Sequence, residues 1–61
     1  MRNHAPAVRY THGRTGEQLV DVCRTPEGAA RAVEHLQLNG HRDIRPVTVA
    51  IQDREIVEVI G

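Results

Sequence analysis

Apolar and polar residues alternate in two stretches near the start of the chain, residues 7–12 and 17–24, and in two near its end, residues 43–51 and 55–61. A period of two places successive side chains on opposite faces of a β-strand, so each stretch predicts a strand. Glycines 13 and 16 in the first connection are typical of a turn. The second connection is the short segment at residues 52–54. We therefore predict two β-hairpins.

Between the hairpins, the segment TPEGAARAVEHLQLNGH at residues 25–41 has the pattern of one complete helix. Thr25 is a favourable N-cap, and Pro26 stands at the first helical position, where its missing N–H costs nothing. Asn39 and Gly40 are typical of a helix C-terminus. The apolar stripe that recurs at helical spacing consists of Ala29, Val33 and Leu36.

The order strand, strand, helix, strand, strand predicts a ββαββ fold of the α+β class, with one helix packed on a mostly antiparallel four-stranded sheet. We expect residues 1–6 to form a flexible N-terminal arm and residues 7–61 a single small domain. A three-residue loop at 52–54 would pair Val49 with Val57. In that register the helix covers the face that carries six valines, namely Val20, Val22, Val47, Val49, Val57 and Val59.

The face of the sheet opposite the helix should be polar if water covers it, yet the last strand alternates Ile56, Glu58 and Ile60 there. A 61-residue chain is also near the lower limit for folding alone. We therefore expect a homo-oligomer, with a dimer favoured, or a heterologous protein partner. The alternative is that these are ordinary exposed aliphatic residues. The expected interface comprises Leu19, Leu38, Ala50, Ile56, Glu58 and Ile60.

Charge and composition argue against nucleic acid and membranes as the main partners. The eight basic residues, all Arg, balance eight acidic ones, and the chain has no Phe or Trp. Nothing here steers the chain generally toward nucleic acid, and no aromatic stacking platform exists. The alternative is a small nucleic-acid-binding regulator that uses Arg9, Arg14 and Arg24 of the first hairpin. No apolar run is long enough to span a membrane.

The residues able to do chemistry are one cysteine, Cys23, and four histidines. No paired metal-ligand spacing lies on a shared element, and nothing brings a base to Cys23, so we expect no metal, cofactor or catalysis. One free thiol favours a reducing compartment, the cytoplasm. Arginine without lysine is typical of a GC-rich genome, so we expect the cell to be a bacterium or a phage-infected host. We therefore expect a non-enzymatic protein-interaction module, a bacterial or phage accessory protein.

Overall fold

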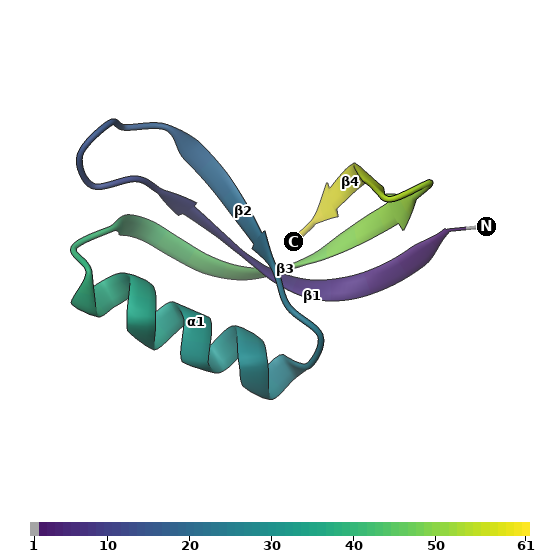
Figure 1. The fold of residues 1–61 in the computed structure, drawn as a ribbon, viewed down its shortest axis with the longest axis horizontal. Helices are drawn as coiled ribbons and strands as arrows, with labels where there is room; N and C mark the ends of the chain where they lie inside the picture. Colours follow the sequence, from purple (N-terminus) through teal and green to yellow (C-terminus); the bar gives the residue numbers. More distant parts are fainter. Residues whose placement is uncertain (1) are drawn as a thin grey trace.

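The computed structural model describes residues 2–61 and has two β-hairpins, one on each side of a helix in the chain (Figure 1). The elements are β1 (Asn3–Thr11), β2 (Gln18–Val22), α1 (Pro26–Leu38), β3 (Arg42–Gln52) and β4 (Glu55–Ile60). They form one sheet in the order β2-β1-β3-β4, with all three pairings antiparallel. The predicted ββαββ fold of the α+β class is confirmed. The two long strands lie in the centre, and β2 and β4 form the edges.

Both ends of α1 follow the sequence signals. The Thr25 hydroxyl accepts a hydrogen bond from the Gly28 backbone N–H at 3.0 Å, which satisfies one of the free donors at the helix start. At the other end, Gly40 has a φ of +81° and the His41 N–H donates to the Leu36 carbonyl. This left-handed turn suits glycine and stops the helix after Leu38.

The N-terminal arm expected over residues 1–6 is wrong from Asn3 onward, because β1 begins there. Asn3 lies opposite Ile51, and the pairing with β3 continues without a break to Arg9. The polar residues at the start of the chain carry no strand pattern of their own. They extend because β3 is 11 residues long and offers them a partner along its length. Met1 lies outside the described residues.

Each long strand contains a proline at a margin of its pairing, where the missing N–H costs the sheet at most one hydrogen bond. The Cys23 N–H donates to the Pro6 carbonyl at 2.8 Å, so the backbone groups of Pro6 face the β2 side, just past the end of β2. Backbone directions alternate along and across an antiparallel sheet. Those of Pro46 therefore face the β4 side, where pairing begins only at Thr48. Pro46 thus occupies a locally open edge, and Pro6 lies at the end of the β1–β2 pairing, both positions that proline tolerates in a sheet.

The helix covers the opposite face from the one expected. Residues that lie directly opposite each other in adjacent strands share a face, as Pro6 does with Thr48 and Val8 does with Pro46. Pro6, Pro46 and Thr48 line a groove together with α1, so theirs is the helix-side face. Five of the six valines assigned to the helix-side face lie on the other one: Val20, Val22, Val47, Val49 and Val59.

The β3–β4 turn also differs from the one expected, and this difference moves Ile56 to the other face of the sheet. The turn has two residues, Asp53 and Arg54, both with positive φ, rather than the three expected. Positive φ at both positions matches the twist of a two-residue hairpin. A register shift follows, because Ile51 pairs with Ile56 but Ala50 pairs with Glu58. Val57 is the extra residue of this bulge, so the strand faces exchange there.

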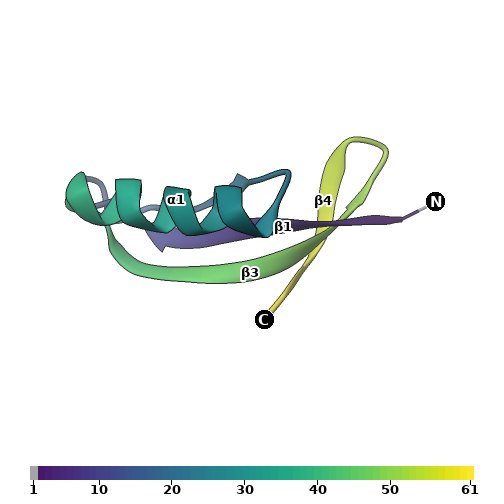
Figure 2. The same cartoon turned by 90° about the horizontal axis from the view of Figure 1, so that it is seen from below.

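The buried core of the described residues is small. Its apolar members below one-tenth exposure are Ala7, Val8, Ala29, Val49 and Ala50. No fully buried side chain is larger than valine. The helix packs on β1 and β3, whereas the β3–β4 hairpin continues past it and turns steeply across the direction of β1 (Figure 2). The last strand therefore lies outside the cover that α1 provides.

Candidate interaction surface

The outer edge of the sheet at β4 is apolar and open to solvent. All six residues of the strand are exposed. Four of them are large aliphatic residues with 42–46% of their surface exposed: Ile56, Val57, Val59 and Ile60. A run of this kind on an edge strand, defined here as the β4 edge (residues 55–60), is the usual mark of a contact site.

The apolar side chains of the β4 edge point to both faces of the sheet. Val59 lies opposite Val49, and Ile56 lies opposite Ile51, so Val59 and Ile56 occupy the face away from α1. Ile60 lies opposite Thr48 and therefore occupies the helix-side face. An interface on one face alone would leave the other apolar side chains in water.

The backbone of the β4 edge is also available. The Pro6 carbonyl faces β2, so alternation makes Thr48 and Ala50 the β3 residues whose backbone groups face β4. Their partners in β4 are Ile60 and Glu58. The N–H and C=O of Val59, between these two, consequently point away from β3 into open solvent. The strand offers both apolar side chains and a free donor and acceptor.

Charge protects this edge only weakly. Natural sheets usually block an open edge with lysine, proline or inward-pointing charges, and the chain has no lysine at all. The strand carries Glu55 and Glu58. Glu58 forms an ion pair with Arg2 at 3.5 Å between side chains that are 53% and 54% exposed. A pair this exposed contributes about 0–1 kcal/mol, but it brings a positive charge beside Glu58.

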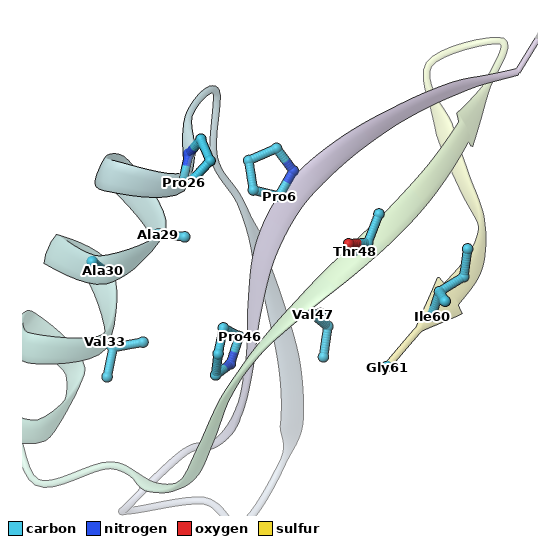
Figure 3. Close-up of a pocket in the computed structure, with 10 residues that line it drawn as sticks. All are labelled: Pro6, Pro26, Ala29, Ala30, Val33, Pro46, Val47, Thr48, Ile60 and Gly61. Carbon is cyan, nitrogen blue, oxygen red and sulfur yellow. The ribbon is translucent and has the colours of Figure 1, made fainter.

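An apolar groove of about 570 Å³ separates α1 from the end of β4 (Figure 3). Side chains from the helix form one wall, the two strand prolines lie between, and Ile60 stands on the far side. The lining residues are Pro6, Pro26, Ala29, Ala30, Val33, Pro46, Val47, Thr48, Ile60 and Gly61. Two of the helix side chains that line the groove are alanines, which fill little of the space between α1 and β4.

The six residues expected at an interface separate into four places. Ile56, Glu58 and Ile60 all lie on β4, but the expectation that they share the face away from α1 is wrong, because Glu58 and Ile60 lie on the helix-side face. Leu38 is 80% exposed, at the end of α1 far from the β3–β4 hairpin. Leu19, opposite Tyr10 in the first hairpin, is half-buried on the helix-side face.

Ala50 is fully buried within the chain and presents no surface to a partner. The sequence interpretation also missed Val57 and Val59, which it placed beneath the helix. They are exposed because β4 lies outside the cover that α1 provides, and the sequence pattern does not show how far the helix reaches across the sheet. Alternation alone therefore could not predict that every residue of β4 is exposed.

The three hairpin arginines are not brought together. Arg9 donates to the Gln18 side chain at 2.8 Å and lies opposite Arg45 in the neighbouring strand. Arg14 is in the β1–β2 turn, and Arg24 follows the opposite end of β2. Arg9 instead has Arg45 as its cross-strand neighbour, a pairing between residues distant in the sequence.

Two of the histidines hold loops together. The His12 Nδ1 accepts hydrogen bonds from the Arg14 and Thr15 backbone N–H groups at 3.1 and 3.3 Å. The His41 Nδ1 accepts one from the Gly13 N–H at 3.1 Å. The two rings lie 4.7 Å apart between centroids. Their acceptor nitrogens serve the backbone, which gives both side chains a structural role at the junction of two loops.

Cys23 is in a poor setting for a nucleophile. Partial burial, and to a lesser extent the negative charge of Asp21, raise the pKa of the Cys23 thiol above its ordinary value. The thiol donates a weak hydrogen bond to the Asp21 carbonyl oxygen at 3.8 Å. These contacts favour the protonated form, which is the unreactive one.

Among residues 2–61, no three His, Cys, Asp or Glu side chains gather as a metal ion would require. Over the same range, no helix has the length and apolar character needed to cross a bilayer. Comparison with known proteins found no match to the chain among protein-family models, curated proteins or solved structures. The β4 edge and its neighbouring groove are therefore the features on which a functional argument rests.

Proposed function

We propose that the protein is a non-enzymatic interaction module that works as a homo-oligomer, most simply a two-fold dimer. The observation that carries this proposal is the β4 edge, where four large aliphatic side chains of one strand are each more than two-fifths exposed. Single exposed aliphatic residues are normal on any protein. Four on one edge strand, with free backbone groups beside them, form a surface that a second chain can cover.

The overall dimensions support the same proposal. The accessible surface is 4736 Å², whereas a compact monomer of 6.8 kDa should expose about 3,950 Å². The radius of gyration is 11.5 Å, against about 10.5 Å for a compact chain of this length. The excess surface is roughly 800 Å², the area that each partner contributes to a standard protein interface.

The small core gives a reason for assembly. Three of the five buried apolar residues are alanines, and the two others are valines. Each such side chain removes little apolar area from water, and hydrophobic stabilisation scales with that area at about 25 cal/mol per Å². A second copy would bury the β4 edge and so add apolar area that the single chain cannot bury.

The alternative, a nucleic-acid-binding regulator, has less support. Arg9, Arg14 and Arg24 lie in three separate places, and the formal net charge is zero. A heterologous protein remains the alternative occupant of the same edge. We place the module in the cytoplasm of a bacterium or of a phage-infected cell, because its free cysteine suits a reducing compartment.

Solution mass by light scattering across a concentration series, with the melting temperature recorded at each point, tests the proposal. We expect a dimer or larger species whose melting temperature rises with protein concentration, because mass action favours the assembled folded state. A folded monomer at every concentration would overturn the homo-oligomer. Adding a partner protein would then be the way to search for the occupant of the edge.

A further inference from the structure

We infer that the β4 edge pairs antiparallel with the β4 edge of a second copy across a two-fold axis at Val59, so that one sheet runs through both chains. This inference rests on the proposed homo-oligomer and adds its geometry. It names the surface, the occupant and the residue on the axis.

The distribution of apolar side chains favours edge pairing over face-to-face packing. Val59 and Ile56 occupy one face of the sheet and Ile60 occupies the other. A face-to-face dimer would cover one set and leave the second in water. A strand added at the edge contacts side chains on both faces at once, since each pair of opposite residues shares a face.

The central positions of the face away from α1 need no second chain. Ala7 and Val49, which lie on that face, are fully buried within a single copy. The apolar surface that remains open on β4 is therefore concentrated at the margin of the sheet. Its location matches what a neighbouring strand would cover.

The backbone fits the same arrangement. The N–H and C=O of Val59 point away from β3, and they are the donor and acceptor that an added strand requires. With Val59 on the axis, the two copies of this residue exchange both hydrogen bonds as one closely spaced pair. Residues 58–60 lie beyond the bulge at Val57, in regular pairing with β3.

Charge selects the position of the axis. An axis at Glu58 would place two carboxylates directly opposite each other, which is destabilising in a sheet. An axis at Val59 instead places Glu58 of each copy beside Ile60 of the other, on the helix-side face. There Glu58 keeps its ion pair with Arg2, and Ile60 gains a neighbour on its exposed side.

Amide hydrogen exchange followed by NMR tests the geometry at single-residue resolution, at concentrations below and above the assembly midpoint. In the monomer the Val59 N–H is free, whereas the amides of Glu58 and Ile60 bond to β3 and act as internal references. We expect Val59 to lose its fast exchange on assembly while the two references are protected in both states. A dimer in which Val59 still exchanges fast would overturn edge pairing and keep the homo-oligomer; a monomer throughout would overturn both.

A matched pair of variants gives a second readout. Val59→Pro removes a donor that bonds nothing in the monomer, and proline is tolerated on an edge strand with its nitrogen toward solvent. We expect V59P to remain folded and lose assembly. Val59→Ala keeps the donor, so we expect V59A to assemble with a raised dissociation constant. A V59P protein that still dimerises would contradict the inference. If V59P does not fold, the amide exchange rate of Val59 in the unaltered chain tests the edge pairing instead.

Discussion

Gly13 and Gly40 meet at the junction of the β1–β2 turn and the loop that follows α1. A Cβ atom built on Gly13 would lie 2.3 Å from the Gly40 carbonyl oxygen, closer than any real contact of this kind. The obstacle is backbone rather than a flexible side chain, so the loops must separate to admit even a methyl group. This contact, together with the hydrogen bond from the Gly13 N–H to His41, joins the first hairpin to the end of the helix.

We predict that Gly13→Ala destabilises the fold by about 1–3 kcal/mol, the usual cost of forcing atoms into a filled space. Gly16→Ala is the matched control. Gly16 also lies in the turn, with a φ of +76°, but nothing stands within 4 Å of its position for a Cβ. Its cost should come from backbone conformation alone and be about 1 kcal/mol. Chemical denaturation at one fixed protein concentration measures both, and equal losses would contradict the steric argument.

His12 should act as an acceptor that closes the β1–β2 turn. Replacing it with alanine leaves the Arg14 and Thr15 N–H groups without the Nδ1 acceptor. We expect His12→Ala to lower the free energy of unfolding by about 1 kcal/mol. Asparagine offers a side-chain oxygen that can accept from the same backbone groups, so His12→Asn should recover part of the loss. No difference between the two variants in thermal unfolding would show that the acceptor role is unimportant.

The helix start depends on the Thr25 hydroxyl, which accepts from the Gly28 N–H at 3.0 Å. We predict that Thr25→Ala costs about 1 kcal/mol of folding stability and that Thr25→Ser costs much less, because serine supplies the same acceptor. Denaturant titration followed by circular dichroism measures both. A serine variant as unstable as the alanine variant would point to the lost methyl group rather than the cap.

Cys23 should react slowly with alkylating reagents at neutral pH. The raised pKa of its thiol means that a given pH produces less thiolate in the folded chain than in the unfolded one. The rate should therefore rise with pH through a midpoint above that of the denatured protein. Asp21→Asn removes the negative charge and should shift the midpoint down, by a small amount because Asp21 is exposed. Equal midpoints for folded and denatured protein would contradict the assigned environment.

A charge placed on the β4 edge should prevent assembly, whereas the same charge placed elsewhere should not. Ile60→Glu puts a carboxylate where the second copy is proposed to pack, next to Glu58 of that copy, and we expect it to yield monomer. Leu38→Glu is the matched control, because Leu38 is 80% exposed on the far end of α1. Light scattering of both variants at equal concentration is the measurement. Loss of assembly in L38E but not I60E would move the interface to the helix.

Local signals in the sequence were enough to predict the order of the elements. Thr25, Pro26 and Gly40 act within one helical turn of their own positions, so the ends of α1 could be predicted without knowledge of its neighbours. Period-two alternation likewise located β2, β3 and β4, and the fold class followed from their order. The extension of β1 to Asn3 could not be predicted, because it depends on a partner strand distant in the sequence.

The sequence predicted the strand that carries the candidate site but not which of its residues are exposed. Surplus aliphatic residues in the last strand indicated a contact surface, and Ile56, Glu58 and Ile60 do lie together on β4. Alternation shows which side chains share a face but not which face the helix covers, and the two-residue turn with its bulge at Val57 moves Ile56 to the face opposite Ile60. The sequence by itself determined the elements, because capping and periodicity are local. Only the tertiary structure decided which residues are exposed, because that depends on long-range register and on how far a single helix reaches across the sheet.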